Sequence, residues 1–182
     1  INIVSAGFDP ISKLDEIPNN PKKRYELMTK DMPSGGELSL DMMYRTCGTQ
    51  LNIDYNSEKD FIKKFKIVNS IVPISIALFA NSSIVEKKNS GYLSYRSKVW
   101  QSTSRGGLPK LFFENLNFEK YAEFVMGFPI LFIQNNETYI SGKKYTFKDF
   151  MDGKIEEIEN RLPTENDLTT HLSTIFTENR LK

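Results

Sequence analysis

The sequence is poor in the residue types on which several kinds of site depend. It has one cysteine, Cys47, and one histidine, His171, among 182 residues. A single cysteine cannot form an internal disulfide, which favours a reducing compartment, and we expect a cytoplasmic protein. One cysteine and one histidine supply too few ligands for a zinc site. A Ser-His-Asp triad is also not expected, because His171 falls in a predicted helix where a structural role is favoured.

An excess of charge of one sign is also absent. Lys and Arg number 24 against 23 Asp and Glu, a net charge of +1, which gives no electrostatic case for a nucleic-acid or anionic-membrane partner. The longest apolar run, Ile71 to Ala80, is interrupted by Pro73 and Ser75. It is far shorter than the ~20 residues of a membrane-spanning helix, so we expect no membrane insertion. No basic stretch leads into an apolar segment at the N-terminus, as a signal peptide would require.

The sequence shows no internal repeat and no regular strand–helix–strand rhythm. Helices and short strands are interleaved irregularly, which predicts an α+β fold rather than a doubly wound sheet. We expect one partial domain over residues 1–182, taken from a longer protein, because the chain begins at Ile1 and ends at Lys182 inside a patterned segment. The predicted helices cover 21–32, 57–79, 117–128, 146–153 and a segment opened by Pro163, and the later predicted strands cover 129–134, 138–140 and 174–181.

One predicted strand, Tyr44 to Asp54, has a polar face. Its packed face carries Cys47, Thr49, Leu51 and Ile53, so we expect Cys47 to be a buried small hydrophobe. The other face carries Thr46, Gly48, Gln50, Asn52 and Asp54. Solvent could cover such a face, but Gln and Asn are weak strand formers, and carboxamides suit a wall that binds phosphate, metal or substrate. The pattern alone leaves both alternatives open.

The segment after Ser57 has the spacing of a long helix with one core-facing stripe. Apolar residues recur every three or four positions from Phe61 to Phe79, and beyond Ile71 the helix is apolar nearly all round, which predicts burial. Pro73 predicts a kink or break near its middle. The polar segments 81–91 and 101–107 are predicted loops.

Several short motifs, taken in their order along the chain, resemble the central part of the sequences of a known enzyme family. They are Gly7-Phe8-Asp9-Pro10, Pro21-Lys22-Lys23-Arg24-Tyr25, Leu40-Asp41-Met42-Met43-Tyr44-Arg45-Thr46-Cys47, Gln50-Leu51-Asn52-Ile53-Asp54, Tyr95-Arg96-Ser97 with Trp100, and Glu178-Asn179-Arg180-Leu181-Lys182. Each is weak alone, but the ordered set resembles glutamate–cysteine ligases of the plant and proteobacterial type.

The resemblance implies a glutamine-synthetase-like antiparallel sheet with packed helices, forming a cleft for ATP, Mg²⁺ and amino acids. It implies ATP-dependent joining of the L-glutamate γ-carboxylate to the L-cysteine amine through a γ-glutamyl phosphate, the first step of glutathione synthesis. The implied partners are therefore small molecules. Because the family's paired glutamates on an early strand have no counterpart here, we expect residues 1–182 alone to be inactive.

The resemblance also assigns roles to particular residues. Arg96 would hold a carboxylate of glutamate, Trp100 would shape that pocket, and Thr46 and Asn52 would face the substrate. Gln50 would lie near the metal, Glu178 would ligate Mg²⁺, and Arg180 would contact the transferred phosphate as the catalytic arginine. From the residues alone, Glu178 and Arg180 could equally form a surface ion pair.

One departure from the family bears on the acceptor amine. Leu131 stands where the family has a tyrosine associated with the cysteine pocket. A carboxylate–amine ligase with a different acceptor is therefore an alternative. A non-catalytic module that binds nucleotide or amino acid, and a purely structural domain with a solvated polar face, are two others.

Overall fold

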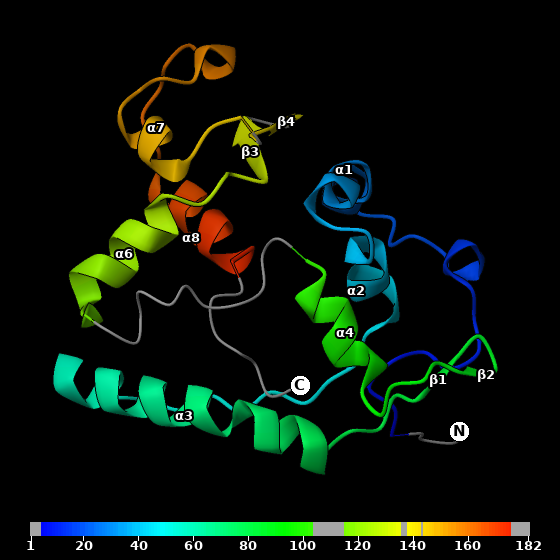
Figure 1. Ribbon diagram of the computed structural model, residues 1–182. Helices are drawn as coiled ribbons and strands as arrows, with labels where there is room; N and C mark the ends of the chain where they lie inside the picture. The colour runs from blue at the N-terminus through cyan, green and yellow to red at the C-terminus, as the bar shows by residue number, and fades with distance from the viewer. Residues whose placement is uncertain (1–4, 104–114, 136–137, 143, 176–182) are drawn as a thin grey trace. The chain divides into compact units, whose positions relative to one another are not determined.

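The structure is a computed structural model that describes residues 5–103, 115–135, 138–142 and 144–175. It has mixed α and β content, with helices and small antiparallel sheets (Figure 1). The chain divides into two compact units. Unit 1 comprises residues 1–20, 32–109 and 176–182, and unit 2 comprises residues 21–31 and 110–175. No helix among the described residues is long and apolar enough to cross a membrane.

The longest element of unit 1 is helix α3, Glu58–Leu78, which confirms the helix predicted after Ser57. Ser57 caps it, because its side chain accepts a hydrogen bond from the amide of Asp60. The helix continues through Pro73 without a break, so the expected break is absent.

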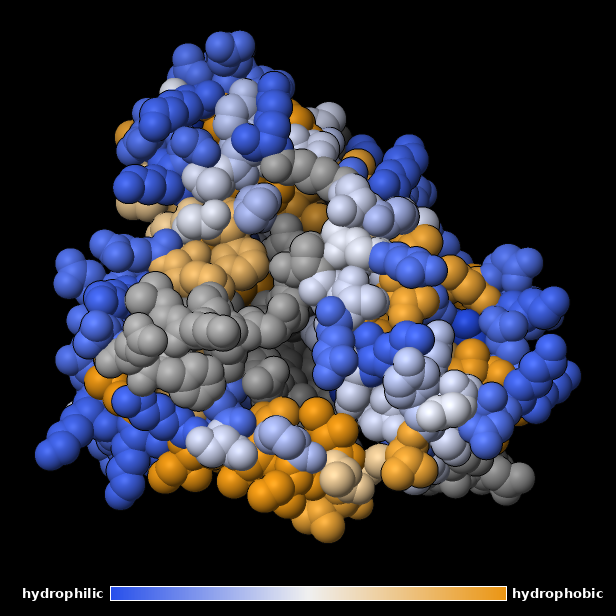
Figure 2. Space-filling model, viewed as in Figure 1, coloured by the Kyte–Doolittle hydropathy of each residue, from blue (hydrophilic) through white to orange (hydrophobic). Residues whose placement is uncertain are grey.

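The second half of α3 is not buried as the sequence predicted. Ile74, Leu78 and Phe79 are 62%, 74% and 77% exposed. Figure 2 shows apolar side chains gathered over this helix at the bottom of the view. The prediction was wrong because an apolar helix is buried only where other elements cover it, and the described residues of unit 1 leave this half uncovered.

The strand predicted over 44–54 is also wrong. Tyr44 belongs to helix α2, Ser39–Arg45, and the residues after Thr46 form no regular strand. Cys47 is exposed rather than buried, and Leu51 and Ile53 are 74% and 52% exposed. An alternating pattern becomes a strand only when a neighbouring strand pairs with its backbone. Thr46 forms one isolated bridge with Phe8, and no paired strand continues over residues 48–55 of the described chain.

The polar segment 81–91, predicted as a loop, contains a small hairpin. Strand β1, Ile84–Val85, pairs antiparallel with β2, Lys88–Asn89. Glu86 and Lys87 form its turn with positive φ angles of 50° and 65°. Helix α4, Tyr95–Gln101, follows, capped by the Ser94 side chain. Unit 1 also contains two 3-10 helices, Leu14–Glu16 and Met32–Gly35.

The core of unit 1 forms around Phe8, which is 1% exposed. Its ring lies edge-on to Tyr95, with centroids 5.0 Å apart, and beneath the guanidinium of Arg45 at 4.5 Å. Arg45 is buried and pairs through Nη1 with Asp41 at 2.9 Å and with Glu86 at 3.3 Å. This ionic cluster joins α2 to the β1–β2 turn.

Unit 2 contains a hairpin formed by the strands predicted over 129–134 and 138–140. Strand β3, Phe132–Asn135, pairs antiparallel with β4, Thr138–Ser141. Two helices of this unit begin at the predicted positions 117 and 146, where Asn117 and Thr146 each accept a hydrogen bond from the third following amide. The last predicted helix, opened by Pro163 in the sequence, is capped by Thr164 in the same way. The helices are α1 (Lys23–Asp31), α6 (Phe118–Met126), α7 (Phe147–Met151) and α8 (Glu165–Ser173), with a 3-10 helix at Glu156–Ile158.

An apolar cluster between the hairpin and α7 holds unit 2 together. Its most buried members are Ile130, Ile133, Phe147, Phe150, Ile155 and Ile158. His171 of α8 is buried against it, stacked on Phe147 with its Nε2 3.0 Å from the carbonyl of Val125. A structural role for His171 is what the sequence favoured. The strand predicted over 174–181 lies mostly outside the described residues, and Thr174 and Ile175 are not in a strand.

Candidate functional site

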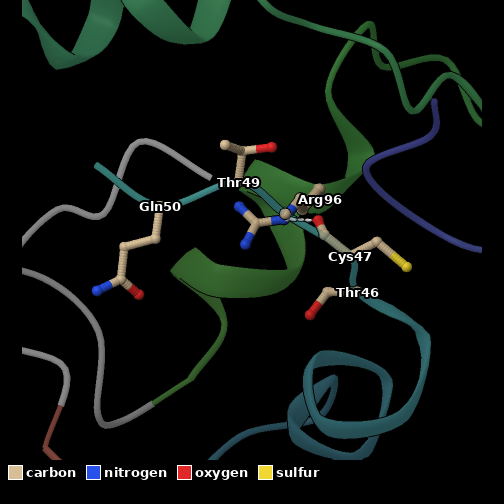
Figure 3. Close-up of a pocket in the computed structure, with 6 residues that line it drawn as sticks. Thr46, Cys47, Thr49, Gln50 and Arg96 are labelled. Carbon is tan, nitrogen blue, oxygen red and sulfur yellow. Dashed lines mark hydrogen bonds between the residues drawn. The ribbon is translucent and has the colours of Figure 1, made fainter. Parts of the chain in front are cut away.

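A small open pocket lies in unit 1 between the segment after α2 and helix α4. Its volume is about 180 Å³. Figure 3 shows the residues that line it. They are Thr46, Cys47, Gly48, Thr49, Gln50 and Arg96. Three of the predicted site residues, Thr46, Gln50 and Arg96, are therefore brought together. Arg96 is remote in sequence from the other lining residues, since Cys47 precedes it by 49 positions.

Arg96 is anchored at the base of this pocket by two hydrogen bonds. Its backbone amide donates to the Ser82 hydroxyl at 3.1 Å, and its side-chain Nε donates to the Cys47 carbonyl at 2.9 Å. The residue is only 7% exposed. Desolvation lowers the pKa of Arg96 to about 10, partly offset by Cys47, so the side chain keeps its positive charge at neutral pH.

The aromatic residue predicted beside Arg96 is in place. The guanidinium carbon of Arg96 lies 5.4 Å from the ring centroid of Trp100, one helical turn further along α4. An aromatic face stabilises a nearby cation and limits the directions in which a guanidinium can turn. Trp100 therefore helps to fix the orientation of Arg96.

The predicted polar residues of the other wall lie together, but on an irregular segment. The Gln50 side-chain amide donates to Asn52 Oδ1 at 2.6 Å, which places Asn52 beside the pocket rather than in its lining. The Thr46 hydroxyl donates to the Met42 carbonyl at 2.6 Å and so ties the start of this wall to the end of α2.

Two predicted site residues, Glu178 and Arg180, lie outside the described residues. Leu131, the residue connected with acceptor specificity, is in unit 2 and is 4% exposed. The structure therefore brings the predicted carboxylate-binding residues together, and the assignments of Mg²⁺ to Glu178 and of the phosphoryl group to Arg180 stay predictions.

The chemistry of the lining suits an anion better than a metal ion. Of the six described lining residues, only Arg96 is charged, and the others offer hydroxyl, thiol, carboxamide and backbone groups. Within the described part of the chain, no group of three or more His, Cys, Asp or Glu residues could hold a metal. A cation beside neutral hydrogen-bonding groups fits a carboxylate, whereas Mg²⁺ prefers carboxylate oxygens and bound water. The pocket as described does not fit Mg²⁺, and no metal-dependent step is derived from it.

The sequence reasoning assigned no role in the site to three of the lining residues, Cys47, Gly48 and Thr49. Cys47 and Thr49 were placed on the packed face of a strand, but both are exposed and line the pocket. Figure 3 shows the Cys47 sulfur pointing away from the Arg96 guanidinium, so its contribution to the site is its carbonyl. No pattern in side-chain types could have identified a role carried by a backbone atom.

Comparison with known proteins decides the family. The sequence profile of "Glutamate-cysteine ligase family 2" matches residues 1–182, the whole chain. The chain belongs to this family. It is 44% identical over 185 residues to glutamate–cysteine ligase A of Oryza sativa subsp. japonica, and 44% and 42% identical to the ligases of Nicotiana tabacum and Arabidopsis thaliana. All of the chain is covered in each comparison, which confirms the resemblance drawn from the ordered motifs.

The same relatives correct the predicted location and show what share of a full-length ligase the chain covers. All three are named chloroplastic, which contradicts the cytoplasmic assignment. The single cysteine argued only against an oxidising compartment, and it could not distinguish between compartments that are not oxidising. The chain spans 38% of the rice ligase and 35% of the tobacco and Arabidopsis ligases.

Proposed function

We propose that the complete protein is a glutamate–cysteine ligase and that the pocket around Arg96 binds a carboxylate of glutamate. The family membership supports the reaction, and the buried, positively charged Arg96 in a neutral polar pocket supports the substrate role. The carboxylates of glutamate would find there a cation whose attraction is strengthened because burial excludes water.

The proposed reaction has two steps. An oxygen of the glutamate γ-carboxylate attacks the γ-phosphorus of ATP, and ADP leaves. The cysteine amine then attacks the carbonyl carbon of the γ-glutamyl phosphate, phosphate leaves, and the nitrogen loses a proton. Arg96 would act by positioning, since it holds one carboxylate of glutamate in place while the other reacts. Glu178 stays the proposed Mg²⁺ ligand and Arg180 the proposed phosphate contact, and Mg²⁺ held there would neutralise phosphate charge. Gln50 belongs to the pocket lining that does not fit Mg²⁺, so we propose that it faces the substrate instead.

The wider architecture is part of the same proposal. The described residues contain two two-stranded antiparallel sheets, β1–β2 and β3–β4. We propose that in the complete protein these belong to a glutamine-synthetase-like catalytic fold. The plant relatives, named chloroplastic, support a plastid location for the complete protein.

The experiment is ADP release by the complete protein with Mg-ATP and glutamate, with and without cysteine, in wild type and in Arg96→Lys. Lysine keeps the charge but loses the fork of N–H donors, so we expect the KM for glutamate to rise by about 10- to 100-fold. Lys98→Met, which removes an exposed cation from the same helix α4, is the control and should leave that KM unchanged.

The outcomes separate the alternatives. Release that depends on cysteine, with a raised KM only in Arg96→Lys, is the expected result. Stimulation by 2-aminobutyrate or alanine but not by cysteine would keep the chemistry and identify a different acceptor, with Leu131 as the first position to examine. Absence of ADP release under every condition would leave a non-catalytic binding module.

A further inference from the structure

The motif Gly7-Phe8-Asp9 has no role in the site described so far, yet it lies directly behind the pocket wall. Phe8 forms an antiparallel bridge with Thr46. The Cys47 amide donates to the Gly7 carbonyl at 3.1 Å, and the Asp9 amide donates to the Arg45 carbonyl at 2.8 Å. These bonds hold the backbone of residues 45–47, whose Cys47 carbonyl in turn accepts from Arg96.

Gly7 also lies against the side chain of Arg96. A Cβ atom placed on Gly7 would lie 3.2 Å from Cδ of Arg96 and 2.8 Å from Oδ1 of Asn81. Both distances are shorter than ordinary carbon contacts, so neither neighbour could keep its position. Gly7 does not have a positive φ angle, and the reason for glycine here is therefore space rather than backbone conformation.

The two side chains that a Cβ on Gly7 would contact differ in their freedom to move. Asn81 is exposed, and its side chain makes one long hydrogen bond of 3.5 Å to Ser5, so it can turn away. Arg96 is buried and fixed at its amide by Ser82, at Nε by Cys47 and near its guanidinium by Trp100. Pushing its Cδ shifts the guanidinium, because the rest of the side chain is held on both sides.

We propose that Gly7 is a positioning residue for Arg96: its missing side chain leaves the space in which the methylenes of Arg96 pass to the pocket, while its carbonyl holds the Cys47 wall. The substrate part of this inference rests on the proposed function, since it expects Gly7 to act on glutamate through Arg96. The chemistry of ligation and the binding of cysteine should not depend on it directly.

The test uses the complete protein and four variants: Gly7→Ala, Asn81→Ala, the double variant Gly7→Ala/Asn81→Ala, and Gly127→Ala. The last is the matched control, because a Cβ on Gly127 would have its nearest neighbours at 3.4 Å, an ordinary contact. We expect Gly7→Ala to raise the KM for glutamate by about three- to tenfold, with kcat and the KM for cysteine within twofold of wild type. The double variant should keep that rise, because removing Asn81 Oδ1 relieves only one of the two clashes.

Three results would overturn the inference. An unchanged KM in Gly7→Ala would show that Arg96 does not depend on this space. A KM restored by Asn81→Ala would show that the clash acts through Asn81. If kcat, kcat/KM for glutamate, kcat/KM for cysteine and the melting temperature all fell together, the substitution would have a general effect on folding.

A structure of the Gly7→Ala variant separates this inference from the proposed function. Displacement of the Arg96 side chain, with a lengthened bond from Nε to the Cys47 carbonyl, is expected whatever reaction the protein catalyses. If the wild type releases no ADP, the proposed function fails while this geometric result can still hold. An unmoved Arg96 would refute the positioning role even in an active enzyme.

Discussion

Arg45 and Lys64 each pair with an aspartate four residues earlier on the same helix, but their surroundings differ. Arg45 is buried between Asp41 and Glu86, with 4% of its side chain exposed. Lys64 pairs with Asp60 at 2.8 Å, with 37% of its side chain exposed. The same spacing therefore produces a buried pair in α2 and a solvated one in α3.

This difference predicts unequal effects of two equivalent substitutions. Arg45→Met leaves the Asp41 carboxylate buried without its cation, and we expect a loss of about 3 kcal/mol in the free energy of unfolding. Lys64→Met should change stability far less, because water solvates the remaining Asp60. Chemical denaturation of both variants measures the difference.

A double variant checks the cause. Replacing both partners, as in Asp41→Leu/Arg45→Met, removes the stranded charge and should recover much of the loss. Equal losses in the Arg45 and Lys64 variants would contradict the burial argument.

At the residue scale, the family resemblance placed two neighbouring residues correctly in space, while their role stays a prediction. The resemblance implied that Arg96 and Trp100 share one pocket, and the two side chains do lie together. The Asp41–Arg45 pair went unnoticed although its i,i+4 spacing was visible, because spacing cannot tell a buried pair from an exposed one. That distinction depends on Phe8 and Glu86, which are remote in sequence.

At the scale of elements, helix α3 contains a proline in its interior. Pro73 has no amide hydrogen to donate to the carbonyl of Asn69, and its ring crowds that turn. Pro73→Ala should therefore raise the free energy of unfolding, by up to about 3 kcal/mol. Thermal unfolding followed by circular dichroism at 222 nm measures it, with Ser70→Ala as a control on the same helix. Lower stability in Pro73→Ala would contradict this and show that packing of the proline ring outweighs its cost to the helix.

The elements that were predicted correctly are those with local causes. Ser57, Thr146 and Asn117 cap helices through bonds to residues three positions away, and such bonds can be read from the sequence. The strand expected over 44–54 failed because strand formation needs a partner from elsewhere in the chain. The hairpin β1–β2 was missed because Glu86 and Lys87 are unusual at positive φ, where Asn and Gly are the common turn residues.

At the scale of the whole molecule, a conspicuous surface feature is the apolar second half of α3, which the described residues leave exposed. Ile71 and Ile74 lie on it, and Leu78 and Phe79 lie at its end. Contiguous apolar surface of this kind favours association. A protein consisting of residues 1–182 should therefore bind a hydrophobic dye and self-associate at raised concentration.

The variant Leu78→Gln/Phe79→Gln tests that expectation. It should lower dye fluorescence and shift the protein toward monomer in analytical ultracentrifugation. Ile11→Gln, which removes a single exposed apolar side chain elsewhere, is the control. Equal effects of the two changes would show that α3 is not the source.

The site as a whole was predictable only in part. The ordered motifs identified the family. The resemblance also pointed to Arg96, Gln50 and Thr46, which line the candidate pocket, and to Trp100, which lies beside Arg96. Neither could show that the Cys47 carbonyl anchors Arg96, or that Gly7 leaves it room, because both depend on the backbone path.

The bond from Arg96 to a main-chain oxygen makes the side chain at position 47 dispensable for anchoring. Cys47 is the one cysteine of the sequence, and it is exposed. Exchanging its sulfur for a hydroxyl group yields a thiol-free chain without disturbing the anchor. New cysteines introduced into α3 or the β3–β4 hairpin could then carry spin labels or fluorophores singly, which opens both units to distance measurements in solution.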